Sequence, residues 1–154
     1  KFNARIPIDE TRAFNISGSI DRIDRLADRR TLRIIDYKTG GDDSTFKDID
    51  ELFDDKKAIL QLYLYCNSLA GELKKDIPMQ PILYLFKKFS TEGITPVKKG
   101  GEPVTDYREL NGEVMAMLKE RLSPLFDREI PFEPDPSKEH CHFCNYREIC
   151  GQAQ

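Results

Sequence analysis

The sequence predicts an α/β (α+β) fold in which a mixed central sheet is flanked by helices. Strand-like sequence comes first, a long amphipathic helix follows, and a further apolar strand and a second long helix complete the chain. Hairpins join neighbouring strands antiparallel, whereas a crossover helix allows the strands before and after it to lie parallel. The order of elements therefore favours a mixed sheet, and 154 residues suffice for one domain with a sizeable core.

Each element has its own sequence signal. The first two strands should form a hairpin that turns at Asp9 and Glu10, and the third is apolar on both faces, as in a central strand. Ser44 is the expected N-cap of the first helix, and Thr105 or Asp106 that of the last. The expected strands are residues 3–8, 12–25, 30–38, 81–89 and 93–98. The expected helices are residues 46–55 (in part), 56–73 and 106–126.

Composition limits the possible functions. Hydrophobic residues make up 39% and charged residues 33% of the chain, and the formal net charge is −3. That charge argues against DNA binding by the whole surface but allows a local basic cleft. No apolar run approaches the ~20 residues of a membrane span, so we expect a cytoplasmic protein without a membrane partner. The chain begins at Lys1 in an expected strand, which suggests a piece of a longer protein.

Carboxylates and a lysine gather where two expected strands pair. Asp36 and Lys38 point to the same side of their strand because side chains alternate, and Asp21 lies on the neighbouring strand. A divalent metal and a phosphate would use such a group, since Mg²⁺ takes one or two carboxylates. Alternatively, the hairpin is an ordinary surface element in which Arg22 and Arg25 pair with the aspartates.

The long helix adds a second polar pair. Gln61 and Tyr65 are four residues apart and share a helix face that is shifted from the apolar one. An amide and a hydroxyl that project together can bind a phosphate or brace catalytic groups. The alternative is that Gln61 is exposed and Tyr65 packs as an ordinary aromatic residue.

The ordered motifs Gly18-Ser-Ile-Asp-Arg-Ile-Asp24, Ile34-Ile-Asp-Tyr-Lys-Thr-Gly40 and Gln61-Leu-Tyr-Leu-Tyr65 resemble the RecB-like branch of the PD-(D/E)XK nuclease superfamily. The resemblance implies a restriction-endonuclease-like core over residues 1–130. It also implies a Mg²⁺- or Mn²⁺-dependent, exonuclease-type deoxyribonuclease that acts in DNA recombination and repair with a helicase domain or subunit as partner.

By the same resemblance, Asp21, Asp36 and the backbone carbonyl of Tyr37 are the expected metal ligands. The expected catalytic residues are Asp21, Asp36, Lys38, Gln61 and Tyr65. Asp24 should instead face the opposite side and pair with an arginine. The family usually has a further helix before the first strand that supplies a His or Glu ligand, and we expect that helix to be missing from this chain.

Three cysteines stand close together in the tail, residues 131–154. Cys141, Cys144 and Cys150 have the spacing C-x2-C-x5-C, and thiolates suit both iron–sulfur clusters and Zn²⁺. The run resembles three of the four ligands of the 4Fe–4S cluster in AddB-type helicase–nuclease subunits. Alternatives are a zinc site completed by His140 or His142, or three free thiols. Cys66 lies on the apolar helix face and is expected to be a core thiol.

Two further surface features remain open. Lys87, Lys88 and the pair Lys98–Lys99 would either line a DNA path or form a solvated strand edge. The aromatic residues Tyr84, Phe86 and Phe89 are expected in the core rather than as a base-stacking surface.

The alternative function for the chain is a DNA-binding or assembly module without catalysis. A weaker alternative is a zinc-stabilised interaction domain.

Overall fold

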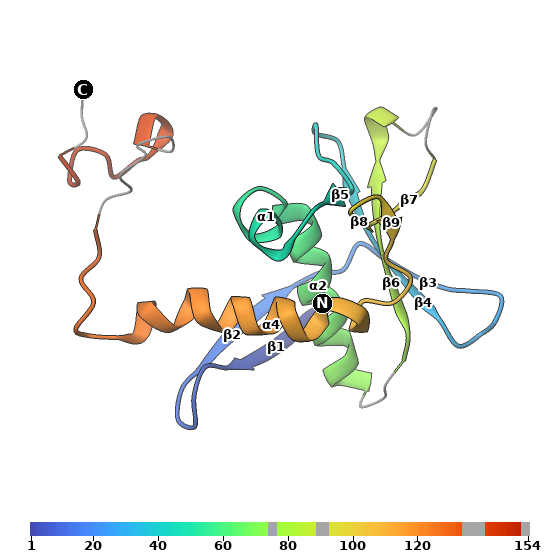
Figure 1. Ribbon diagram of the computed structural model, residues 1–154, viewed down its shortest axis with the longest axis horizontal. Helices are drawn as coiled ribbons and strands as arrows, with labels where there is room; N and C mark the ends of the chain where they lie inside the picture. The colour runs from blue at the N-terminus through green and yellow to red at the C-terminus, as the bar shows by residue number, and fades with distance from the viewer. Residues whose placement is uncertain (74–76, 89–92, 134–140, 152–154) are drawn as a thin grey trace. The chain divides into compact units, whose positions relative to one another are not determined.

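The computed structural model describes residues 1–73, 77–88, 93–133 and 141–151, except the side chain of His142 (Figure 1). The chain divides into two compact units, Lys1–Leu122 and Ser123–Gln154. Among the described residues, the strands and the long helices belong to the larger unit, and the smaller one contains short 3₁₀ turns.

A four-stranded sheet with the order β3-β4-β6-β7 forms the centre of the larger unit. Strands β4 and β6 are parallel, whereas β3 and β7 pair antiparallel with their neighbours, so the sheet is mixed, as predicted. Helix α2 (Lys57–Leu73) makes the crossover between β4 and β6. The strands are β3 (Arg22–Arg25), β4 (Leu32–Lys38), β6 (Met79–Leu85) and β7 (Thr95–Pro96).

Two smaller sheets accompany the central one. Strands β1 (Phe2–Pro7) and β2 (Ala13–Gly18) form an antiparallel hairpin whose turn is held by Asp9. The Asp9 carboxylate accepts hydrogen bonds from the backbone of Thr11 at 2.9 Å and of Arg12 at 2.7 Å, and these bonds hold its pKa well below the usual value. The third sheet has the order β5-β8-β9, with β5 (Thr45–Phe46), β8 (Lys98–Lys99) and β9 (Glu102–Pro103).

The expected single strand over residues 12–25 is wrong, because the chain changes sheets within it. Strand β2 ends at Gly18 beside β1, and β3 begins at Arg22 beside β4. Gly18 pairs with Phe2, and a Cβ at position 18 would lie 2.8 Å from the Phe2 ring. The glycine therefore lets the buried ring pack against the backbone just before the chain leaves the hairpin. The imperfect alternation of residues 12–25 reflects this break.

The caps and ends of several elements also differ from expectation. Asp48, not Ser44, caps helix α1 (Ile49–Asp54) by accepting a 2.9 Å hydrogen bond from the Glu51 backbone. Ser44 is buried, and its carbonyl accepts a hydrogen bond from the Lys98 backbone at 2.8 Å. Strand β6 ends at Leu85, where a 3₁₀ turn (Phe86–Lys88) begins. Helix α4 covers Arg108–Leu122, and Asp106 accepts from the Arg108 backbone at its start.

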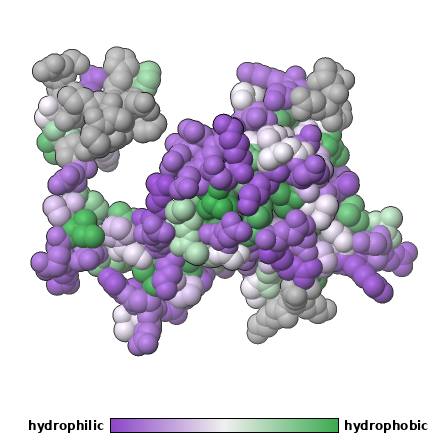
Figure 2. All heavy atoms as spheres, in the orientation of Figure 1, coloured by the Kyte–Doolittle hydropathy of each residue, from purple (hydrophilic) through white to green (hydrophobic). Residues whose placement is uncertain are grey.

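Helix α2 and one face of the central sheet share the hydrophobic core. The predicted apolar face of α2 is buried, including Leu62, Tyr63 and Cys66, and it meets Ile34 of β4 and Leu83 of β6. Figure 1 shows α2 between the β1–β2 hairpin and the central sheet. In the larger unit, the face seen in Figure 2 carries mostly hydrophilic residues. In the described part of the chain, no helix is long and apolar enough to cross a membrane.

The core position of α2 leads to a stability prediction. Replacing the fully buried Leu62 with alanine removes methyl groups and leaves a cavity, so we expect the free energy of unfolding to fall by about 2–5 kcal/mol. Leu73→Ala is the matched control, because Leu73 ends the same helix and is 38% exposed. Urea denaturation of the two variants measures the difference. Equal losses would contradict the assigned burial.

Candidate active site

The carboxyl end of β4 places an aspartate and a lysine on the face of the sheet that α2 covers. Asp36 is 2% exposed, and its Oδ2 atom lies 2.8 Å from the Nζ atom of Lys38. The two side chains share one face because they are two residues apart on a strand. Ile34, two residues earlier on this face, is fully buried. The Asp36–Lys38 pair therefore lies on the same face of β4 as the core residue Ile34, where the hydrophobic core ends.

Asp21 lies beside this pair, just before β3. Its Oδ2 atom accepts a hydrogen bond of 2.9 Å from the backbone N–H of Tyr37, between Asp36 and Lys38. This bond fixes the Asp21 carboxylate against the end of β4. Sequence reasoning missed the bond, although it could place Asp21 on a strand that pairs with β4.

The electrostatics of Asp36 reflect its position. Burial raises the pKa of the Asp36 carboxyl above its usual value, Lys38 partly offsets this, and the negative charge of Asp21 adds to the increase. Burial alone would lower the pKa of Lys38, but the Asp36 carboxylate more than compensates, and the pKa of Lys38 is raised. The lysine is therefore an ammonium group at neutral pH.

Helix α2 connects to the same group through a short chain of hydrogen bonds. Lys38 Nζ donates to Gln61 Oε1 at 3.0 Å, and Gln61 Nε2 donates to the Tyr65 hydroxyl. Tyr65 is buried, and its ring makes an edge contact with Phe2 at a centroid distance of 5.2 Å. The i, i+4 spacing predicts that Gln61 and Tyr65 meet. The link from Gln61 to Lys38 needs the tertiary structure.

The Asp36 carboxylate has an unused hydrogen-bonding capacity. Its Oδ2 atom is buried and lies 2.8 Å from the Lys38 ammonium group, and no further hydrogen-bond partner for it stands among the described residues. An ionised carboxylate has about four acceptor positions, so Asp36 can bind a further ion or donor beside Lys38. The residues therefore fit a divalent cation.

The number of carboxylates favours a particular class of ion. Within the described ranges, no group of three or more His, Cys, Asp or Glu side chains is arranged to hold a metal. Two carboxylates, Asp21 and Asp36, suit Mg²⁺ or Mn²⁺, whose remaining positions are filled by water and by phosphate oxygens. That the carbonyl of Tyr37 is a third ligand stays a prediction.

Asp24 lies apart from this site. It forms an ion pair of 2.8 Å with Arg22, which agrees with the expected pairing to an arginine. The Asp24 carboxylate is therefore already neutralised, which makes it a suitable control position for metal binding.

The tail cysteines belong to the smaller unit. Cys141 and Cys144 are partly buried and Cys150 is exposed, and all three are free thiols. The backbone of Cys144 donates to the carbonyl of Cys141 at 3.1 Å, in a short turn. Their role as metal or cluster ligands stays a prediction, and His140 lies outside the described residues. Cys66 is fully buried in α2, and burial raises the pKa of its thiol.

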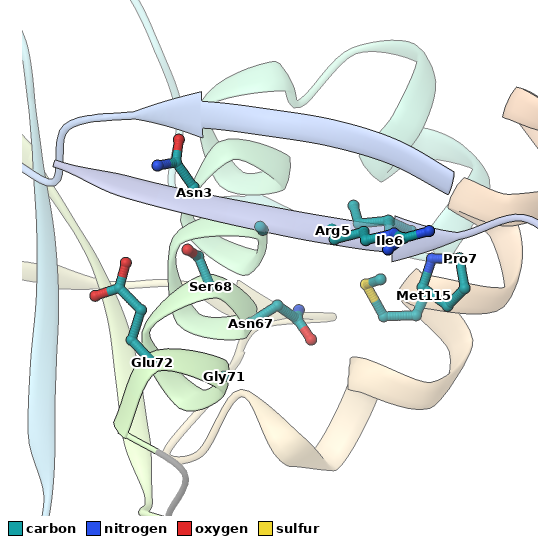
Figure 3. A pocket seen from close by; sticks show the side chains of 10 residues that line it. Asn3, Arg5, Ile6, Pro7, Asn67, Ser68, Gly71, Glu72 and Met115 are labelled. Atoms are coloured by element: carbon teal, nitrogen blue, oxygen red, sulfur yellow. The ribbon is translucent and has the colours of Figure 1, made fainter. Parts of the chain in front are cut away.

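A separate groove of about 310 Å³ lies between β1, α2 and α4 (Figure 3). It is lined by Arg5, Ser68, Glu72 and Met115, among others, and none of the predicted site residues lines it. The Ser68 hydroxyl is buried without a hydrogen-bond partner among the described residues. This groove is distinct from the carboxylate site.

The fold and the carboxylate–lysine site together define a nuclease-type domain. The family description "PD-(D/E)XK nuclease superfamily" matches residues 2–151, almost the whole chain. The chain belongs to this superfamily, and its mixed sheet with flanking helices is consistent with the restriction-endonuclease-like fold. The resemblance seen in the sequence motifs is thereby confirmed at the level of the superfamily.

One relative gives a more specific comparison. Over 134 residues, the chain is 30% identical to a subunit of an ATP-dependent helicase/deoxyribonuclease from Acetivibrio thermocellus. The aligned stretch covers 84% of this chain and 11% of the relative, so the chain spans a small part of that protein's length. No solved structure matches the chain.

Proposed function

We propose that this chain is the nuclease domain of a Mg²⁺- or Mn²⁺-dependent, exonuclease-type deoxyribonuclease. We propose further that it works with a helicase domain or subunit in DNA recombination and repair. The observation that carries the nuclease proposal is the buried Asp36 carboxylate, which Asp21 and the Lys38 ammonium group flank at the end of β4. The name of the bacterial relative supports the helicase partner.

Each residue of the site has a different proposed role. Asp21 and Asp36 would hold the cation, which when bound supplies an activated water and charge stabilisation for phosphodiester hydrolysis. Lys38, as an ammonium group, donates hydrogen bonds that position the attacking water and neutralise charge on the phosphate. Gln61 fixes the Lys38 amine through its Oε1 atom, and Tyr65 orients the Gln61 amide.

Metal binding should be visible without any DNA. We expect Mg²⁺ or Mn²⁺ to raise the melting temperature of the wild type, because an ion that binds only the folded state stabilises it. The increase should be absent in Asp36→Asn and retained in Asp24→Asn, whose carboxylate already pairs with Arg22. Differential scanning fluorimetry with and without EDTA measures this. An equal increase in both variants would contradict the assigned ligands.

DNA cleavage is the direct test of the proposed function. Incubation of the complete protein with end-labelled linear DNA should give Mg²⁺-dependent cleavage that EDTA stops. Release of mononucleotides or short products from the ends would support the exonuclease assignment, and internal cuts in a circular substrate would contradict it.

The second candidate function is a DNA-binding or assembly module without catalysis. The presence of only two carboxylates at the described site favours it. DNA binding by the complete protein without any metal-dependent cleavage would support this second candidate and overturn the first.

We also propose that residues 131–154 form a separate cluster-binding tail in which Cys141, Cys144 and Cys150 supply three ligands. Their spacing resembles that of three cluster ligands in AddB-type helicase–nuclease subunits, and thiolates are the usual ligands of a 4Fe–4S cluster. Anaerobically purified complete protein should contain iron and acid-labile sulfide, and Cys144→Ser should lose both. Zinc without sulfide would support a Cys₃His site instead, and no metal would support free thiols.

A further inference from the structure

Three aromatic rings form a cluster at the end of the central sheet. Tyr37 and Tyr84 pair across β4 and β6, and their ring centroids lie 5.2 Å apart in an edge contact. Phe86, just after β6, lies 5.1 Å from Tyr84 and 5.9 Å from Tyr37. The expectation that Phe86 is a core residue is wrong, because it is 54% exposed, and Tyr37 is 36% exposed. Phe89 lies outside the described residues.

The geometry of the cluster leaves Phe86 more than half exposed. Phe86 is tilted by 57° to Tyr84 and by 50° to Tyr37, so neither tyrosine lies parallel against it. The two tyrosines brace the ring from the side. Exposing a large aromatic side chain to water is unfavourable. The exposed Phe86 ring, held by two tyrosines, therefore suits a flat apolar ligand.

Positive charge lies next to these rings. Arg22 is exposed on the neighbouring strand β3 and contacts the Tyr37 side chain, and Lys87 follows Phe86 and is exposed. Arg22 is paired with Asp24, whereas Lys87 makes no ion pair with the described residues. Aromatic rings beside cationic side chains are the combination that binds unpaired nucleic acid, in which bases stack on rings and phosphates meet cations.

The cluster and the proposed active site share one end of the sheet. Tyr37 stands between Asp36 and Lys38 on β4, so its side chain points to the opposite face. Lys38 pairs with Leu85, the residue before Phe86. A single strand of DNA that passes over this end of the sheet can therefore contact the aromatic rings on one face of the sheet and the carboxylates on the other.

We propose that Phe86, braced by Tyr37 and Tyr84, stacks on an unpaired base of single-stranded DNA. This stacking guides the strand to the carboxylate site. A duplex offers no free base faces away from its ends, so the surface selects single strands or frayed ends. The inference rests on the proposed nuclease function for its substrate, but stacking can be measured without cleavage.

Tryptophan substitution tests the stacking, because the chain contains no native tryptophan. In metal-free complete protein, the fluorescence of Phe86→Trp should be quenched by single-stranded DNA and much less by blunt duplex. If the complete protein contains other tryptophans, the wild type gives their background. Leu73→Trp is the control, since Leu73 is also exposed but ends α2, at the far end of the crossover from the carboxyl ends of β4 and β6, and it should show no quenching. No quenching at position 86, or equal quenching at both positions, would overturn the proposal.

Affinity measurements separate this proposal from the nuclease proposal. With metal chelated, Phe86→Ala and Phe86→Leu should each weaken single-strand binding about tenfold, while Phe86→Tyr should retain it. If the wild type never cleaves when metal is present but Phe86→Ala still weakens single-strand binding, the nuclease proposal fails and the stacking surface stands. If the wild type cleaves and Phe86→Ala binds with unchanged affinity, the stacking surface fails. Loss of a partner protein from Phe86→Ala, with unchanged DNA binding, would overturn the stacking proposal and identify a protein interface instead.

Discussion

Replacing Asp36 with asparagine is expected to reduce Mg²⁺-dependent DNA cleavage by about a thousandfold or more, because a neutral amide cannot replace a metal-binding carboxylate. Such a loss corresponds to about 4 kcal/mol of transition-state stabilisation. The change is nearly isosteric, so the packing around the buried side chain should be kept. Cleavage rates at saturating DNA, measured over a range of Mg²⁺ concentrations, give the effect.

The same substitution should not destabilise the metal-free protein. Burial raises the pKa of Asp36, which means that its ionised form is less favourable in the folded chain than in the unfolded chain. Removing that charge should therefore leave the melting temperature in EDTA unchanged or higher, although Lys38 loses its partner. Asp24→Asn is the control and should cleave like the wild type. Full cleavage by Asp36→Asn, or a collapsed melting temperature, would show that Asp36 has a structural role.

Opposite effects on activity and stability are typical of a functional site. A carboxylate buried at the end of a core strand, with a second carboxylate beside it, is costly unless a ligand uses it. Tyr63 and Ser68 have buried hydroxyls without partners among the described residues, but neither stands beside two carboxylates and a lysine. The combination at Asp36 therefore distinguishes a candidate site from ordinary packing imperfections.

The sequence predicted the central features of this site because they depend on local periodicity. Alternation along a strand places Asp36 beside Lys38, and helical spacing places Gln61 beside Tyr65. The apolar face of α2 was likewise predicted correctly. Features that depend on contacts distant in sequence were not predictable in the same way. The bond from Lys38 to Gln61 is one example, and the bond from Tyr37 to Asp21 is another.

The errors have a common physical cause. At Gly18 the Phe2 ring packs on the chain where it leaves the hairpin, and after Ser44 the chain first forms β5 beside β8, so that α1 begins at Ile49 and is capped by Asp48. Phe86 follows an apolar strand and looks like its continuation, but β6 ends at Leu85 and the chain turns outward. In each case tertiary packing overrode a pattern that was locally reasonable.

Replacing Lys38 with methionine should also reduce cleavage, by about a hundredfold to ten-thousandfold. Unlike Asp36→Asn, this change removes a positive charge, and it should destabilise the metal-free protein. Without the ammonium group, the buried Asp36 and its neighbour Asp21 repel each other with no cation between them. Lys38→Met leaves the buried Asp36 charge without its partner, whereas Asp36→Asn removes that buried charge, so the lysine variant should be the destabilised one. Because Lys38 is partly exposed, we expect a melting temperature in EDTA lower by about 5–10 °C.

Divalent metal should reverse this loss of stability, because the ion supplies the positive charge that Lys38 no longer provides. The stabilisation by Mg²⁺ should therefore be larger in Lys38→Met than in the wild type, while cleavage stays low. Gln61→Ala should show a smaller loss of melting temperature and a smaller extra stabilisation by metal. It removes the Oε1 atom that fixes Lys38 but keeps the Lys38 charge. A Lys38→Met variant that gains no extra stability from metal would mean that Asp21 and Asp36 do not share a cation. If Lys38→Met also cleaved normally, the assigned roles of all three residues would be wrong.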